Sequence, residues 1–290
     1  MDRQRVFQAC SQSFAIGART YIMGILNITP DSFSDGGNYI DPDAAVARAL
    51  AMVEEGADIL DIGGESTRPG HRPLSADEEA ARILPVIRRL HGETGTAISV
   101  DTSKASVARA AVDAGACIIN DVRALRADPD MVRTAAETGA GLVLMYNASP
   151  MLSGVSDPDP SWSQAEDLFS RIIRYLSFSI RLASDHGIGA NRLMIDPGIG
   201  FGVTAEESCT ILRRLSELAV LEAPVLIGPS RKSFIGKTLN LPVEDRLMGT
   251  AAAVALGIAN GADFIRVHDV LDMTRVARMA DAIMRRGCDG

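Results

Sequence analysis

Residues 97–121 read AISVDTSKASVARAAVDAGACIIND and contain one complete strand–helix–strand unit. Ala97–Asp101 and Cys117–Asp121 are short, nearly continuous apolar runs, as expected for parallel strands that are buried on both faces. Ser106–Ala114 has the apolar spacing of an amphipathic helix, and the glycine of Ala114-Gly115-Ala116 is suited to end it. The stretch therefore predicts a βαβ unit within a parallel sheet.

The same unit recurs along the chain. We expect strands at Tyr21–Asn27, Ile59–Gly63, Ala97–Asp101, Cys117–Asp121, Gly141–Tyr146, Arg192–Asp196, Pro224–Gly228 and Phe264–His268. We expect helices at Ala44–Glu55, Ala80–Leu90, Ser106–Ala114, Pro129–Glu137, Ala165–His186, Ala205–Leu218, Asp245–Ala259 and Leu271–Met284. Eight such pairs predict an α/β fold, a single (β/α)8 TIM-barrel domain spanning residues 1–290. No GxGxxG follows the first strand, which disfavours a dinucleotide-binding sheet.

Local signals support these boundaries. Asp41 before Pro42 is typical of an N-cap followed by proline at the first helical position. Ser75 and Glu78 have the spacing of a capping box. Residues 1–20 are interpreted as a short N-terminal hairpin that closes the bottom of the barrel, with its turn near Gly17-Ala18.

The bulk composition excludes several classes of protein. The chain has 290 residues, 47% of them hydrophobic and 23% charged, which is ordinary for a globular enzyme. A net charge of -8 argues against a nucleic-acid partner, because phosphate backbones favour a broad basic surface. No apolar run approaches the roughly 18 residues of a membrane span, and the start lacks a signal-peptide pattern. We therefore expect a cytoplasmic protein without a membrane partner.

Polar residues gather at the predicted strand ends, where the active sites of such barrels lie. Asp101, Asn120, Asp196 and Lys232 end or follow four different strands. Each has an ordinary explanation alone; Asp101 could be a helix N-cap, for example. Together they predict one polar pocket, suited to a ring that carries several hydrogen-bond donors and acceptors. The glycine-rich loops after the first two strands are long enough to act as lids.

Several motifs resemble those of one enzyme family. MGILNITPDSFSDGG at residues 23–37 and DIGGESTRPG at residues 61–70 are very similar to two signatures of dihydropteroate synthases. Further agreement comes, in order, from DTSK at 101–104, IND at 119–121, DPGIGFG at 196–202, SRKSFIG at 230–236 and RVHD at 266–269. The resemblance covers residues from about Thr20 to Met284.

The resemblance implies a transferase of folate biosynthesis and a sulfonamide target. It would join 6-hydroxymethyl-7,8-dihydropterin diphosphate to p-aminobenzoate, giving 7,8-dihydropteroate and diphosphate. It implies pterin contacts from Asp101, Asn120, Val122, Met145, Asp196, Phe201, Gly228, Lys232 and Arg266. It implies diphosphate contacts from Asn27, Thr67, Arg68, Arg266 and His268, and p-aminobenzoate contacts from Phe33, Thr67, Pro69, Lys232 and Ser233. Asn27 would help to bind Mg2+, and a homodimer formed through the late helices is also implied.

The residue types suit this chemistry. Departure of diphosphate leaves a pterin methylene cation, so charge must be stabilised at both ends. Asp101, Lys232, Arg266 and His268 are therefore the candidate catalytic residues. An arylamine is neutral at physiological pH and needs no strong base, in keeping with the lack of a Ser–His or Cys–His arrangement. Tyr146 is a departure, because many family members carry histidine there.

Three alternatives are weaker. A methyltetrahydrofolate:corrinoid methyltransferase would share the barrel and the pterin pocket but not the SRK motif or the two loop signatures. A pterin-binding paralogue without turnover would be expected to lack some of Asn27, Arg68, Lys232 and His268, and all four are present. A variant of lowered sulfonamide sensitivity finds no support in Phe33, Thr67 or Pro69.

Overall fold

The structure, a computed structural model, describes residues 5–29, 41–65, 74–151 and 155–286. Eight parallel strands are arranged in the order β8-β7-β6-β5-β4-β3-β10-β9. Their bounds are β3 Tyr21–Asn27, β4 Ile59–Gly63, β5 Ala97–Asp101, β6 Ile118–Asp121, β7 Gly141–Met145, β8 Leu193–Asp196, β9 Leu226–Ile227 and β10 Phe264–Val267. A single bridge between Ile195 and Val225 joins the two ends of the sheet, so the predicted TIM barrel is confirmed.

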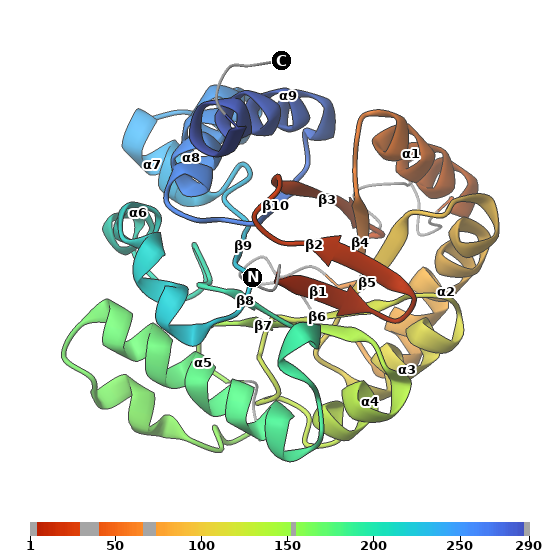
Figure 1. The fold of residues 1–290 in the computed structure, drawn as a ribbon. Helices are drawn as coiled ribbons and strands as arrows, with labels where there is room; N and C mark the ends of the chain where they lie inside the picture. Colours follow the sequence, from red (N-terminus) through yellow and green to blue (C-terminus); the bar gives the residue numbers. More distant parts are fainter. Residues whose placement is uncertain (1–4, 30–40, 66–73, 152–154, 287–290) are drawn as a thin grey trace.

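The helices form a ring around these strands (Figure 1). They are α1 Pro42–Glu54, α2 Ala76–Glu93, α3 Ala105–Asp113, α4 Met131–Thr138, α5 Leu168–Asp185, α6 Ala205–Arg213, α7 Ser233–Leu239, α8 Leu247–Ala259 and α9 Val270–Asp281. Their apolar faces pack on the outward side chains of the barrel, for example Leu60 and Leu142. Among the described helices, none is long and apolar enough to cross a bilayer.

The predicted helix starts are confirmed in atomic detail. Asp41 accepts a hydrogen bond from the main-chain N–H of Asp43 at 2.9 Å. Ser75 and Glu78 form both halves of a capping box at the start of α2. Each arrangement satisfies N–H groups that the first turn of a helix leaves without an intrahelical partner.

Two predictions about helices were wrong. The helix expected over Ala205–Leu218 ends at Arg213, and a 3-10 segment, Leu215–Leu221, follows it. Helix α7 was not predicted, because its seven residues, which begin within the SRKSFIG motif, are too few to show a clear period. Strand β9 is therefore followed by two helices, α7 and α8.

The N-terminal hairpin lies across one end of the barrel (Figure 1). It consists of β1 Val6–Ala9 and β2 Gln12–Ala15, which pair antiparallel. Phe7 and Phe14 pack against Phe264 of β10 and fill the barrel bottom with a second apolar cluster. The bottom closure is as expected, but the predicted position of the turn was wrong.

The hairpin turn lies at Cys10-Ser11, because Ala9 pairs with Gln12. Gly17 instead has a φ of 93° in the turn that connects β2 to β3. Gly17 therefore does occupy a turn, as predicted, but it is the turn after the hairpin and not the turn within it.

Candidate active site

The carboxyl ends of the barrel strands bring the predicted polar residues to one mouth. Asn27, Gly63, Asp101 and Asn120 are register partners across four neighbouring strands, β3 to β6. Asp196 ends β8, and Lys232 follows β9. Closure of the barrel therefore places side chains that are remote in sequence around a single opening.

Arg266 of β10 forms the centre of the charged network. Its Nε donates to Asp61 Oδ2 at 2.5 Å, and its Nη2 donates to Asp101 Oδ2 at 2.6 Å. Asp61 also accepts a hydrogen bond from Asn120 Nδ2 at 3.1 Å. Although burial alone lowers the pKa of Arg266, the two carboxylates outweigh it and raise that pKa, so the guanidinium stays charged.

Asp61 is the main site residue that the sequence reasoning missed. It lies in the middle of β4 rather than at its end, and its side chain is fully buried. A charged residue in the otherwise apolar run Ile59–Gly63 was the signal that could have identified it, because a buried carboxylate requires a partner.

Asp101 is strongly perturbed by its surroundings. Burial raises its pKa to about 7, the charge of Arg266 opposes this rise, and the charge of Asp61 adds to it. Two carboxylates therefore share one guanidinium in a desolvated position. Such an arrangement suits a group that must stabilise positive charge developing on a bound ring.

Asp196, at the end of β8, and Lys232, after β9, influence each other through their charges. Burial raises the pKa of Asp196 to about 6, although the main-chain N–H of Gly198 donates to its carboxylate at 2.7 Å. Burial lowers the pKa of Lys232 to about 7, against the attraction of Asp196. The Lys232 ammonium also lies 3.6 Å from the centre of the Phe201 ring.

The SRK segment has an unusual backbone. Arg231 adopts a φ of 55°, which costs about 1–3 kcal/mol for a residue with a side chain. Asp269 holds its guanidinium through two hydrogen bonds, of 2.9 and 2.5 Å. Ser230 Oγ meets His268 Nδ1 at 2.9 Å and accepts from the main-chain N–H of His268 at 3.1 Å. These contacts tie the segment that carries Lys232 to the end of β10.

The remaining predicted residues fall into two groups. Val122, Met145, Gly228 and Ser233 are on the described part of the chain. The Val122 carbonyl accepts from Asn147 at 3.0 Å, Met145 is buried, and Ser233 begins α7 with its side chain exposed. A Cβ at Gly228 would lie 3.8 Å from Arg266 Cβ, so this glycine keeps the flank of Arg266 open. Phe33, Thr67, Arg68 and Pro69 lie outside the described residues.

Tyr146 does not belong to the mouth. Its side chain is fully buried and its ring packs edge-on against Trp162 and Tyr175. Burial raises the pKa of its hydroxyl to about 12. The Tyr146 side chain is therefore part of the packing between the barrel and the surrounding helices.

The chain is similar to known proteins of one family along most of its length. The model of the family described as pterin binding enzyme matches residues 23–268. A dihydropteroate synthase from Clostridium beijerinckii is 44% identical over 277 residues, covering 95% of this chain and 98% of the relative.

Two solved structures are similar throughout. A dihydropteroate synthase from Clostridium difficile, solved in the presence of pteroic acid, is 45% identical with a TM-score of 0.86, covering 94% of this chain and 100% of that one. The enzyme from Xanthomonas albilineans with 4-aminobenzoic acid is 40% identical with a TM-score of 0.87, covering 97% and 98%.

The barrel and the carboxylate, amide and cation pattern at its mouth define a TIM-barrel enzyme of the pterin-binding class. Within that class, the chain belongs to the dihydropteroate synthase family and is a transferase of folate synthesis.

Proposed function

We propose that the protein catalyses the condensation of 6-hydroxymethyl-7,8-dihydropterin diphosphate with p-aminobenzoate at the barrel mouth, and that the residues there have the roles described below. The observation that carries this proposal is the placement of Arg266 between Asp61 and Asp101, with Asp196 and Lys232 close enough to feel its charge. The relatives solved with pteroic acid and with 4-aminobenzoic acid support the two substrate classes.

The pterin ring presents N–H donors and a carbonyl acceptor on one edge. Asp196 can accept from the donors, while Lys232 and Asn120 can donate to the acceptors. Burial strengthens each of these hydrogen bonds because the local dielectric is low. The planar guanidinium of Arg266 offers a face for stacking on the ring.

The reaction breaks the bond between the pterin methylene carbon and the diphosphate oxygen, and the electron pair leaves with diphosphate. The lone pair of the arylamine nitrogen then forms the new C–N bond, and the nitrogen releases a proton. Asp101 stabilises the positive charge on the pterin, while Arg266 and His268 stabilise the leaving oxygens. Exclusion of water from the site prevents water from attacking the pterin methylene carbon before the arylamine does.

Mg2+ is the proposed cofactor, with Asn27 as its protein ligand. Among the described residues, no three His, Cys, Asp or Glu side chains are grouped so that they could hold a metal ion. The donor set nevertheless fits Mg2+, which often binds through one or two protein oxygens together with substrate phosphates and water. A Cβ at Gly63 would lie 3.8 Å from Asn27 Oδ1 and 3.5 Å from Asp101 Cβ, so glycine keeps space beside this oxygen. When bound, Mg2+ neutralises charge on the departing diphosphate.

The decisive experiment measures diphosphate release from the pterin substrate in the presence of Mg2+, with and without p-aminobenzoate. Release that depends on p-aminobenzoate, with an equal amount of dihydropteroate, supports the proposal. Tight pterin binding without turnover would instead indicate a binding paralogue. Sulfonamides, as arylamine analogues, should compete with p-aminobenzoate in the same assay.

We also propose a homodimer of one-domain chains in the cytoplasm. Large apolar side chains are exposed on α7, α8 and α9 or close to their ends: Leu239, Met248, Leu256, Leu271, Met279 and Ile283. Met248 is 77% and Leu256 61% exposed, which is unusual for a face that stays in water. Leu256→Lys should convert the dimer to a monomer in sedimentation experiments, and an unchanged dimer would exclude this face.

A further inference from the structure

The glycine-rich turn after β8 rests directly on the chain that follows β7. Tyr146 N–H donates to the Asp196 carbonyl at 2.8 Å, and Ala148 N–H donates to the Phe201 carbonyl at 3.1 Å. A Cβ at Gly198 would lie only 1.8 Å from the Tyr146 carbonyl oxygen, so the two backbones are in close contact. The position of Asp196 and Phe201 therefore depends on where Tyr146 and Ala148 lie.

Tyr146 is in turn held by two other aromatic residues. Its ring centre lies 5.6 Å from that of Trp162 and 5.2 Å from that of Tyr175, and these two lie 5.3 Å apart. All three pairs meet edge to face, the favourable geometry for aromatic rings. Trp162 belongs to the segment Asp157–Gln164 between β7 and α5, which we call the strap.

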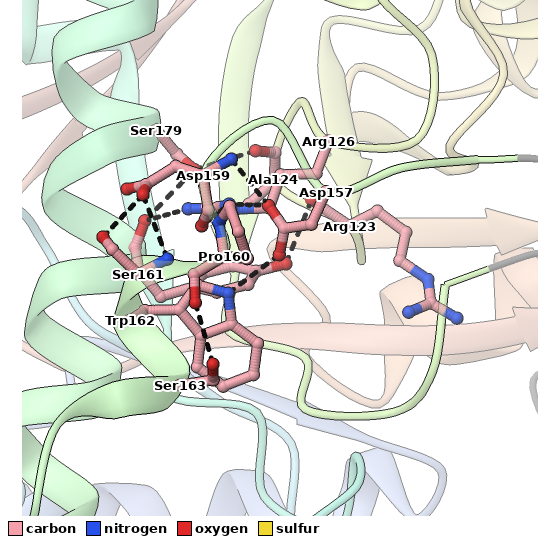
Figure 2. Close-up of polar contacts among 11 residues, drawn as sticks. Arg123, Ala124, Arg126, Asp157, Asp159, Pro160, Ser161, Trp162, Ser163 and Ser179 are labelled. Carbon is pink, nitrogen blue, oxygen red and sulfur yellow. Dashed lines mark hydrogen bonds and ion pairs between the residues drawn. The ribbon is translucent and has the colours of Figure 1, made fainter.

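Arg126 holds the strap through several polar contacts (Figure 2). Its side chain is fully buried, forms an ion pair with Asp157, and donates to the Asp159 and Tyr175 carbonyls at 3.1 Å each. Trp162 Nε1 donates to the other Asp157 oxygen at 2.8 Å. The guanidinium lies 3.9 Å from the centre of the Tyr175 ring. Asp157 thus joins the buried cation to the tryptophan.

The turn that carries Arg126 is strained. Ala124 and Leu125 have φ values of 49° and 66°, which are costly for residues with side chains. Asp121 accepts from the Leu125 N–H at 2.7 Å, and Ser179 Oγ donates to the Ala124 carbonyl at 2.8 Å. A strained backbone that several contacts maintain in this way is typical of segments that position functional residues.

The same turn holds the other end of the supporting chain. Figure 2 shows Arg123 pointing away from the strap, and its Nη1 donates to the Ser149 carbonyl at 3.0 Å. Asn147 Nδ2 also donates to the Val122 carbonyl at 3.0 Å. Residues 146–149 are therefore fixed at the Tyr146 ring by the strap and at Ser149 by Arg123.

We propose that the strap and Arg126 form a positioning device for the pterin pocket. Asp157 and Trp162 act through Tyr146 on the main chain of Asp196 and Phe201, and neither touches the substrate. This inference rests on the proposed function, because the proposed function assigns Asp196 and Phe201 to pterin binding. A cluster that only stabilised the fold would lower the fraction of active enzyme but leave pterin affinity unchanged.

The test compares Asp157→Asn with Asp159→Asn. Asp157 accepts from Arg126 and Trp162 on different oxygens, so an amide must turn its NH2 group toward one of these donors. The exposed Asp159 carboxylate accepts from Ser161, a capping role that asparagine also fills, and Arg126 contacts only its carbonyl. Each of the two variants removes one carboxylate, and the two positions are two residues apart on the same strap.

We expect Asp157→Asn to raise the KM for the pterin diphosphate and the calorimetric Kd for 6-hydroxymethylpterin about tenfold, which is about 1.4 kcal/mol of binding free energy, because Asp196 and Phe201 lose their support. Asp159→Asn should change both by less than about twofold. Trp162 is the single tryptophan of the chain, so its emission should shift to the red in Asp157→Asn and not in the control.

Red-shifted emission with unchanged KM and Kd in Asp157→Asn would overturn the proposal. If that variant fails to fold, Trp162→Phe keeps an aromatic ring against Tyr146 but loses the N–H donor and the second ring of the indole. Its Kd must then rise relative to wild type, or the proposal fails. A wild-type enzyme that binds pterin without forming dihydropteroate would contradict the proposed function. The pterin Kd values of Asp157→Asn and Asp159→Asn would in that case still test whether the strap and Arg126 position the pocket.

Discussion

Asp61 and Arg266, 205 residues apart in the chain, are joined by a hydrogen-bonded ion pair of 2.5 Å beneath the barrel mouth. Asp61 is fully buried and also holds the amide of Asn120. One carboxylate that is not placed at a strand end therefore orients two of the predicted pterin-binding side chains.

Asp61→Asn is expected to lower kcat/KM about tenfold or more, because it releases two side chains that must be oriented. The free energy of unfolding should fall by about 2 kcal/mol, less than the roughly 3–5 kcal/mol of a fully unpaired buried charge, since Asp101 still pairs with Arg266. Steady-state kinetics and chemical denaturation measure both. Asp58→Asn, at the other end of the same strand region, is the matched control, because Asp58 binds Arg19 at the barrel bottom. Equal losses in the two variants would contradict the assigned role of Asp61.

Asp101→Asn should reduce the rate of the chemical step by about 100-fold, because an amide cannot offset positive charge on the pterin. Single-turnover measurements separate this step from product release. Asparagine has the same size and can still accept from Arg266, so pterin affinity should change much less than the rate. An unchanged chemical rate would remove Asp101 from the catalytic residues.

The stability of the protein should depend on the charge of Asp101. Burial raises its pKa to about 7, well above the ordinary value of about 4. The folded chain then holds the proton more tightly than the unfolded chain. The resulting stabilisation is fully present below about pH 4 and is lost as the pH rises through about 7.

Asp101→Asn carries no titrating carboxyl, so its Tm should fall less than that of wild type between pH 5 and about 8. Thermal unfolding of both proteins across this range provides the measurement. Parallel Tm curves would show that the carboxyl does not have a raised pKa in the folded chain.

Tyr146→Phe should stabilise the protein. The buried Tyr146 hydroxyl has no hydrogen-bond partner among the described residues, and such a group costs about 1–3 kcal/mol. We expect the Tm to rise by about 2–4 °C. Tyr175→Phe is the matched control and should lower the Tm, because Tyr175 Oη donates to the Arg123 carbonyl at 3.3 Å. A lower Tm in Tyr146→Phe would mean that the hydroxyl is satisfied.

The sequence was most informative where one physical signal dominated. The strands Tyr21–Asn27, Ile59–Gly63 and Ala97–Asp101 have the predicted bounds, because strands buried on both faces are continuous apolar runs. The strand-end rule likewise brought Asp101, Asn120 and Asp196 to one mouth, since parallel strands all end on the same side. Short elements gave no comparable signal, and α7 was missed for that reason.

Other features could not be predicted because they depend on neighbours that are remote in sequence. Nothing local to Tyr146 shows whether its ring faces the mouth or the helices; Trp162 and Tyr175 decide this by packing against it. The strained φ of Arg231 is similarly maintained by Asp269, 38 residues further on.

The sequence by itself determined the order of the barrel strands and of the helices other than α7, the first turns of α1 and α2 and the side of the barrel that carries the polar residues. These follow from periodicity and capping, which act within a few residues. Only the tertiary structure decided that Asp61 pairs with Arg266 and that burial shifts the pKa values of Asp101 and Lys232 toward about 7. Pairing and desolvation are set by how the barrel closes, and closure joins residues that no local pattern connects.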